Sequence, residues 1–408
     1  VALRHACGPK LGLSTSHTTE AIPPMLGVLE AAGLSTLQAQ EVWSHRPAGK
    51  LPGQRQQVAM LEWLQHEFVA DSGNEQQTAR VIYLCLRKEP RLILLAGKLP
   101  RLQENLNGLR QLLTEINPPR FTESVIHLPA LLLLPADIQQ QRAWWLQSRV
   151  QLTDKELAIA LSKAPRVLLA SSDEIEIRLA WLNERLGISG GRLRRVVSRA
   201  PLSLLLSVNR TLEPRLGYFE QLGIDEALLA NLVVRSPRLL HTPLNYLRVK
   251  TQWLVERGIA PEGCSLSNWL ARQPDYFDVP RARCEQIVLW LEQLPLPAGG
   301  AVEVLRAEPL ILTMKQEQLE LRASFFTSVL GGTLEELVQV PHMLSCDLDK
   351  HAMLRYAFCL MRGVSVSPTD LLVKGNARFC MEVVGCSEQE LHDFAADGLH
   401  LRFYQGVE

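Results

Sequence analysis

Apolar and polar residues follow a block pattern in this chain that recurs about every 36 residues. The clearest copies begin at Leu161, Val196 and Leu232. In each copy a basic residue comes two positions before a proline, leucine-rich residues follow the proline, and an amphipathic run ends at Gly-Ile. Self-similarity with a fixed period of about 20–50 residues is typical of a solenoid, in which each unit packs only on its neighbours.

Prolines mark the register of this repeat along most of the chain. Successive members lie 32 to 39 residues apart: Pro90, Pro129, Pro165, Pro201, Pro237, Pro274, Pro309 and Pro341. Pro47 fits as a degenerate first member. The repeat therefore accounts for most of the 408 residues.

Each unit contains signals for two main helices. A capping box at Thr153 and Glu156 opens a helix of about ten residues, which Pro165 ends. A second capping box at Ser171 opens a longer helix, which Gly187 stops. The longer helix has an apolar stripe of period 3.6: Ile175, Leu179, Leu182 and Leu186. Aromatic residues sixteen to eighteen positions after the prolines are assigned to the core between repeats: Trp145, Trp181, Phe219, Trp253, Trp290 and Phe326.

These signals predict an all-α helical-repeat solenoid, because no alternating pattern is long enough for a strand. We expect three parts: an N-terminal tail and cap over residues 1–40, the solenoid over 41–386, and a C-terminal cap and tail over 387–408. The tail has no acidic residue before Glu20 and resembles the flank of an organellar transit peptide. No apolar run approaches the roughly 20 residues of a membrane helix, so no membrane association is expected.

The sequence offers little for catalysis. Phosphate-binding, dinucleotide-binding, zinc-protease and serine-hydrolase motifs are all missing. The ten histidines are scattered, and the eight cysteines form no CxxC pair, which is typical of buried thiols in a reducing compartment. We therefore expect no enzyme activity, no cofactor and no metal site.

Basic residues hold phase with the repeat and form two columns. The first column stands two positions before the prolines, with Arg306 one residue out of phase: Lys88, Lys163, Arg199, Arg235, Arg272 and Arg306. The second column stands thirteen or fourteen positions after them: Arg142, Arg178, Arg215, Lys250, Arg322 and Arg355. The Pro274 unit has Ile287 and Val288 at this phase.

The columns have two interpretations. As two basic stripes along the solenoid they would contact a polyanion. As structural residues they would pair with a carboxylate or with the dipole at their own helix end, which suits the first column because it lies in the last turn of its helix. Charge favours a binding face in the middle of the chain: residues 185–250 contain eleven Lys and Arg against four Asp and Glu. Arg192, Arg194 and Arg195 are its densest cluster.

The motif basic-x-Pro-x-Leu-Leu, then an amphipathic helix, then Leu-Gly-Ile, resembles the repeat of the mitochondrial transcription termination factor (mTERF) family. The likeness covers roughly residues 41–386 and is strongest from Leu152 to Gly258. It implies a left-handed superhelix of three-helix units, the third being the short turn after the proline. It also implies arginines and lysines on the inner face as DNA contacts. The matching positions are Arg142, Arg178, Arg215, Lys250, Arg322 and Arg355, with Arg199 and Arg235 second, and we add the Arg194–Arg195 cluster.

The resemblance leads to one main functional prediction and two alternatives. We expect a monomeric organellar protein, in mitochondria or alternatively chloroplasts, that binds double-stranded DNA and terminates or regulates transcription. The first alternative is RNA binding in splicing or ribosome assembly. The second is a scaffold whose concave face binds a protein partner. The zero net charge and the gap in the Pro274 unit depart from the basic character of DNA-binding members.

Overall fold

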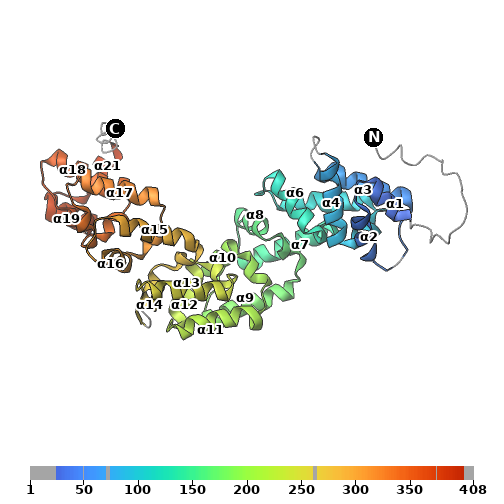
Figure 1. Ribbon diagram of the computed structural model, residues 1–408, viewed down its shortest axis with the longest axis horizontal. Coiled ribbons are helices and arrows are strands. Elements are labelled where there is room, and N and C mark those ends of the chain that lie inside the picture. Colours follow the sequence, from blue (N-terminus) through green and yellow to red (C-terminus); the bar gives the residue numbers. More distant parts are fainter. Residues whose placement is uncertain (1–23, 49, 70–73, 261–263, 374, 399–408) are drawn as a thin grey trace, which may run out of the picture. The chain divides into compact units, whose positions relative to one another are not determined.

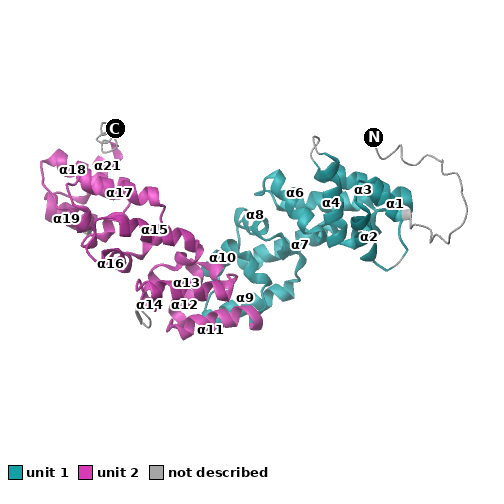
Figure 2. Cartoon of the chain, viewed as in Figure 1, with its two compact units in different colours: residues 1–208 teal, residues 209–408 magenta. Residues whose placement is uncertain are grey.

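The fold is an all-α helical repeat, as the sequence predicts. The computed structural model describes residues 24–48, 50–69, 74–260, 264–373 and 375–398, and these contain no strand. The chain divides into two compact units, residues 1–208 and 209–408 (Figure 2).

Unit 1 is built from pairs of α-helices joined by short 3₁₀ helices (Figure 1). The α-helices are α1 (Pro24–Ala31), α2 (Thr36–Ser44), α3 (Gln54–Phe68), α4 (Glu75–Lys88), α5 (Leu99–Leu112), α6 (Pro118–His127), α7 (Ala136–Val150), α8 (Asp154–Lys163), α9 (Ser172–Leu186) and α10 (Gly190–Arg199). The 3₁₀ helices each begin at a proline of the register: η2 (Pro90–Leu95), η3 (Pro129–Leu133), η4 (Pro165–Leu169) and η5 (Pro201–Leu205). The short third helix that the family resemblance implied is therefore confirmed.

Unit 2 continues the same pattern to its last repeats. Its α-helices are α11 (Glu213–Gln221), α12 (Glu226–Arg235), α13 (Leu244–Glu256), α14 (Cys264–Arg272), α15 (Arg281–Gln293), α16 (Gly300–Ala307), α17 (Gln316–Ser328), α18 (Leu354–Arg362), α19 (Pro368–Val373), α20 (Asn376–Arg378) and α21 (Glu388–Ala396). The 3₁₀ helices are η7 (Pro237–Leu240), η8 (Pro274–Asp278), η9 (Pro309–Thr313), η10 (Leu334–Val338) and η11 (Pro341–Leu344), and the π-helices are η6 (Val208–Leu212), which spans the unit boundary, η12 (Leu348–Met353) and η13 (Phe379–Val384).

The capping boxes and the glycine that the sequence offers as helix ends do begin and end helices in the structure. The Thr153 side chain accepts from the backbone N–H of Glu156 (3.2 Å), and the Glu156 carboxylate accepts from the N–H of Thr153 (2.9 Å), which caps α8. Ser171 opens α9 with the same box, and Gly187 ends α9 with φ 59°. That left-handed backbone suits glycine because it has no Cβ. The predicted bounds of both helices are confirmed within one residue.

Equivalent helices of successive repeats pack beside each other. In unit 1 the first helices α4 and α6, and α8 and α10, are in contact, as are the second helices α5, α7 and α9 and the 3₁₀ helices η2 to η5. Unit 2 repeats this with α12 against α14, α15 against α17, and η8 against η9. Each repeat thus supplies one helix to each of three layers, and the core lies between the layers.

The aromatic column occupies this core. Phe219, Trp253 and Phe326 are 2%, 3% and 0% exposed. Trp181 and Trp290 are also buried, and Trp145 is half-buried. The prediction that these rings pack between repeats is confirmed for the five buried members.

The ends of the chain carry further helices. Within residues 1–40, α1 and the start of α2 are described and pack against α3 and α4, while residues 1–23 lie outside the described part. At the other end α21 packs against α18 in an apolar cluster that includes Phe358 and Phe394. Residues 399–408 of the predicted C-terminal tail also lie outside it.

Candidate nucleic-acid interface

The second column of cations bonds to main-chain carbonyls of the next repeat. Each member lies on a helix of one repeat and reaches toward the C-terminal end of the helix that begins at the next proline. The pairs are Arg142 with the carbonyl of Leu168 (2.7 Å), Arg178 with Leu206 (2.9 Å), Arg215 with Thr242 (2.6 Å), Lys250 with Val279 (2.5 Å), Arg322 with Cys346 (2.8 Å) and Arg355 with Leu371 (2.7 Å). The last carbonyls of a helix have no hydrogen-bond partner within it, and they carry partial negative charge. A cationic donor therefore supplies the missing hydrogen bond and also a favourable opposite charge. We call these contacts the inter-repeat clamps.

Two residues that the sequence columns missed extend the clamps. The Asn105 side-chain amide donates to the carbonyl of Leu132 (2.8 Å), one repeat before Arg142. Arg283 donates to the carbonyl of Thr313 (3.4 Å) in the unit that has no cation at the expected phase. Arg283 precedes Ile287 by four residues, about one helical turn, so it comes from the same face of α15. The gap that the sequence predicts is therefore filled by a neighbouring residue.

Lys250 is the most deeply buried clamp. Its side chain is 0% exposed, and its ammonium group lies 4.0 Å from the centroid of the Tyr276 ring, besides donating to the carbonyls of Tyr276 and Val279. Burial lowers the pKa of Lys250 from 10.5 to about 8. A side chain enclosed in this way cannot reach a phosphate. The prediction that Lys250 contacts nucleic acid is therefore corrected to a packing role.

Arg355 needs the same correction. It is 3% exposed, its guanidinium donates to the Asn376 side chain (2.6 Å) as well as to Leu371, and burial lowers its pKa. The remaining arginines of the column are half-buried: Arg142, Arg178, Arg215 and Arg322. Three of them also donate to the carbonyl four residues earlier in the chain, and these carbonyls belong to Glu174, Thr211 and Gln318. A guanidinium has five N–H donors in a fixed fork, so donors remain for a further partner.

The first column also bonds to helix ends. Lys88 donates to the carbonyl of His127 (3.2 Å), Lys163 to Ser198 (3.2 Å) and Arg235 to Ala271 (3.3 Å). Arg272 donates to the carbonyls of Arg306 (2.9 Å) and Ala307 (3.2 Å), and Arg306 donates to Gly258 (2.7 Å). Each of the first four therefore holds the end of the equivalent helix one repeat later. These residues therefore have a structural role, but the expectation that each pairs at its own helix end is wrong, because the first four bond to a helix end one repeat later.

The arginines of α10 present a different arrangement. Arg192, Arg194, Arg195 and Arg199 are all exposed, and the opposite face of the helix buries Leu193, Val196 and Val197. The spacing of three and four residues places Arg192, Arg195 and Arg199 in one row along the helix. Helix α10 contains no acidic residue. We call the four arginines the α10 cluster.

Helix α8 borders the α10 cluster. Lys163 reaches α10 by donating to the carbonyl of Ser198, the residue that precedes Arg199. Glu156 lies 3.4 Å from Arg194. The pKa of Glu156 is lowered by the backbone N–H of Thr153 first and by the charge of Arg194 to a lesser degree. Glu156 is therefore an acidic neighbour of the cluster, and Lys163 lies at its edge.

A comparison with known families decides the class of this repeat. A model of the mTERF family matches residues 116–331, more than half of the chain. The chain belongs to the mTERF family. The matched range includes the α10 cluster and the clamps from Arg142 to Arg322. No curated protein matches the sequence.

Membership sets the general function. mTERF proteins form a nucleic-acid-binding repeat family of organelles that is generally non-enzymatic. Asn105 and Arg355 lie outside the matched range, yet they make the same carbonyl contacts as the clamps within it. The mTERF repeat architecture thus extends beyond the matched residues at both ends.

Further exposed cations lie in unit 2 of this mTERF protein. Of the eleven basic residues in the positively charged window, eight are exposed, Arg185 and Arg215 are half-buried, and Lys250 is buried. The exposed members in unit 2 are Arg210, Arg235, Arg238 and Arg248. The Arg248 guanidinium lies 5.7 Å from the centroid of the Tyr218 ring. The positive window of the sequence is therefore mainly a surface feature.

Other kinds of site find no support in the described residues. No group of three or more His, Cys, Asp or Glu side chains there is placed to hold a metal ion. None of the helices in the described ranges has the length and apolar character needed to cross a membrane.

Proposed function

We propose that this mTERF protein binds double-stranded DNA in an organelle and thereby terminates or regulates transcription. The α10 cluster carries the proposal, because it gathers four exposed arginines on a helix with no acidic residue. Arginine and lysine contacts with phosphates supply most of the sequence-independent affinity for DNA. The location we propose is the mitochondrion, with the chloroplast as the alternative, and the protein acts as a monomer.

The row of Arg192, Arg195 and Arg199 suits a phosphate backbone. Seven residues of α-helix rise by about 10 Å, and one strand of a duplex carries a phosphate about every 3.4 Å of its axis. Successive phosphates of a winding strand lie farther apart than this rise along the axis, so a row of this length can contact about two of them. Arg194 and Lys163 flank it on α10 and α8.

The clamps contribute less to the proposed interface. We assign Arg142, Arg178, Arg215 and Arg322 as secondary phosphate contacts, through the guanidinium donors that the carbonyls leave. Arg235 is exposed in unit 2 and is a further secondary contact. Lys250 and Arg355 are excluded because they are buried.

Titrations with duplex DNA and single-stranded RNA of the same length and sequence test the substrate. We expect tighter retention of the duplex in a mobility-shift assay at every salt concentration. Tighter retention of the RNA favours the alternative role in splicing or ribosome assembly. Absence of salt-dependent retention of either one contradicts nucleic-acid binding through the α10 cluster.

Protein binding is a second candidate function, because unit 1 has an apolar groove. The groove lies between α4 and α6, has a volume of about 630 Å³, and is lined by Phe68, Val81, Leu84, Pro118 and Ile126 among others. Replacing Val81 and Ile126 with lysine tests it. Loss of an organellar protein partner with unchanged DNA retention supports a scaffold role, whereas unchanged partner recovery contradicts it.

A further inference from the structure

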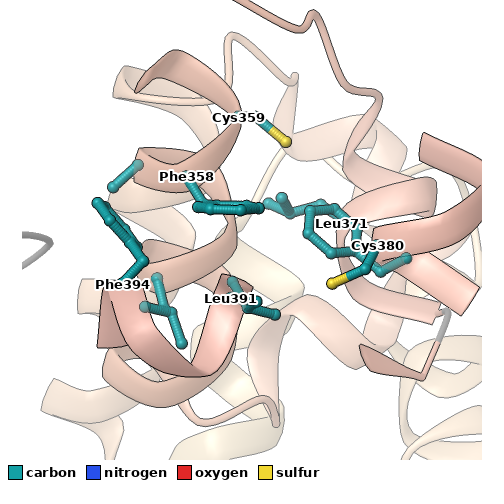
Figure 3. Packing of buried hydrophobic residues seen from close by; sticks show 9 residues of the cluster. Phe358, Cys359, Leu371, Cys380, Leu391 and Phe394 are labelled. Atoms are coloured by element: carbon teal, nitrogen blue, oxygen red, sulfur yellow. The ribbon is translucent and has the colours of Figure 1, made fainter. Parts of the chain in front are cut away.

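Three thiols gather in the C-terminal core of unit 2. Cys359 on α18 and Cys380 on η13 are 1% and 0% exposed and belong to the apolar cluster that Figure 3 shows with Phe358, Leu371 and Phe394. Cys386 follows η13, is half-buried and packs against the same cluster. All three are free thiols. No step of the proposed nucleic-acid binding uses them.

The backbone brings Cys380 and Cys386 together. Gly385 has φ 74° and turns the chain back at the end of η13, so that the N–H of Cys386 donates to the carbonyl of Cys380 (2.9 Å). Residues joined by a direct backbone hydrogen bond lie close to the Cα separation of about 4.4–6.8 Å that a disulfide requires. The two side chains are also in hydrogen-bonding contact. The pair can therefore be bridged with little movement of the backbone.

The two thiols differ in access. Cys386 is half-buried and is the one that a small molecule reaches first. Cys380 is enclosed, and its pKa is raised to about 11 by burial first and then by Cys386 and Glu388, while the Arg355 guanidinium acts in the opposite direction. An accessible thiol next to a buried one is the arrangement of an attacking and a resolving cysteine.

We propose that Cys380 and Cys386 form a reversible disulfide when the protein meets a small disulfide such as oxidised glutathione. The Cys386 thiolate attacks one sulfur of the oxidant, forms a mixed disulfide and releases one glutathione thiolate. Cys380 then gives up its proton to the released glutathione thiolate and attacks the Cys386 sulfur, which releases the second glutathione. The two protein thiols are oxidised, the oxidant is reduced to two glutathione molecules, and the two thiol protons end on them.

The bond would tie the end of η13 to the segment that leads into α21. Helix α21 completes the C-terminal core through Leu391 and Phe394. Oxidation therefore fixes the last helix of the repeat array, at a place remote in sequence from the α10 cluster. Because the ring closed by the bond is short, the expected gain in global stability lies toward the low end for a disulfide, and the bond itself is the quantity to measure.

Peptide mapping of the full chain tests the pair directly. Trypsin cleaves after Arg378 and Arg402, so Cys380 and Cys386 share one peptide, whereas Cys359 lies in the peptide of residues 356–362. After treatment with oxidised glutathione and blocking of free thiols, we expect the shared peptide to lose two hydrogen atoms and to regain them with dithiothreitol. We expect Cys359 to stay free.

Two variants separate the steps. Cys380→Ser should stop at a glutathione adduct on Cys386, and Cys386→Ser should give neither adduct nor disulfide. Because Cys380 is buried, Cys380→Ser can also destabilise the core. Cys386→Ser lies at a half-buried position, so its loss of the disulfide can be read without that effect. Full alkylation of both thiols in the wild type, or a cross-link from either thiol to Cys359, overturns the proposal.

Discussion

The ammonium group of Lys250 donates a hydrogen bond to the carbonyl oxygen of Val279 at 2.5 Å, from a side chain that is 0% exposed. Val279 follows η8, and Lys250 lies on α13 of the preceding repeat. The same contact recurs from Arg142 on α7 to Arg322 on α17. The first role of the cations at this phase of the repeat is therefore structural: they connect each repeat to the next.

The protonation of Lys250 should make stability depend on pH. In the unfolded chain Lys250 has its ordinary pKa of 10.5, and in the folded chain burial lowers it to about 8. Between these values the unfolded state binds more protons, so the stability of the folded state rises with pH from about 8 to about 10.5. Below pH 8 both states are charged, and the penalty for burying the charge is constant.

Urea unfolding of the wild type and of Lys250→Met at pH 7 and pH 10 measures how much the titration of Lys250 contributes to the free energy of unfolding. We expect the stability of the wild type relative to the variant to rise by about 1–3 kcal/mol over that range. Comparison with the variant cancels the titration of buried groups that do not interact with Lys250, whereas the pKa of Cys284, which Lys250 lowers, stays in the difference. An unchanged difference shows that Lys250 is not buried as a charge.

The clamp at Arg142 should stabilise the fold. Arg142→Met keeps most of the apolar stem but leaves the carbonyl of Leu168 without its donor, which should cost about 1–2 kcal/mol. Arg195→Met, at an exposed position on α10, should change the free energy of unfolding by less than about 0.5 kcal/mol. Equal effects of the two substitutions in urea unfolding speak against a structural role of the clamp.

Glu156 should weaken the attraction of the α10 cluster for an anion. Glu156→Gln removes the negative charge 3.4 Å from Arg194, while the glutamine side chain still accepts from the N–H of Thr153. At low salt we expect duplex DNA to bind roughly two- to fivefold more tightly. The matched control is Glu336→Gln, which alters the equivalent capping box at the start of η10. A similar gain from both substitutions points to net charge rather than to the cluster.

The sequence predicts the fold in detail because its signals are local. Helix ends depend on a residue and its neighbours three or four positions away, as Thr153 and Glu156 show, and Gly187 requires only its own backbone angle. The proline register then repeats these local signals and predicts two main helices per repeat, and the resemblance to the mTERF family adds the short third helix. The bounds and packing of the helices therefore follow from the chain alone.

The candidate site is less predictable, because phase within a repeat does not say which way a side chain points. Lys250 and Arg355 share a phase with half-buried arginines, yet they are enclosed by their neighbours. Asn105 and Arg283 make clamp contacts without matching the basic pattern at that phase. The sequence does contain one usable signal. The carbonyls at the C-terminal end of the short helix after each proline need a hydrogen-bond donor from a neighbouring segment. Searching for that donor would have found Asn105 and Arg283.

The salt dependence of duplex binding tests the central claim most directly. The apparent affinity is measured over a salt series for the wild type, for Arg192→Gln/Arg195→Gln/Arg199→Gln, and for a control with the same charge change at exposed positions outside α10, Arg55→Gln/Arg101→Gln/Arg120→Gln. Circular dichroism verifies that all three proteins are folded. If the α10 cluster holds the DNA backbone, the logarithmic salt slope falls by about 2–3 in the α10 variant and by less than about 1 in the control. Equal slopes in the two triple variants contradict the account.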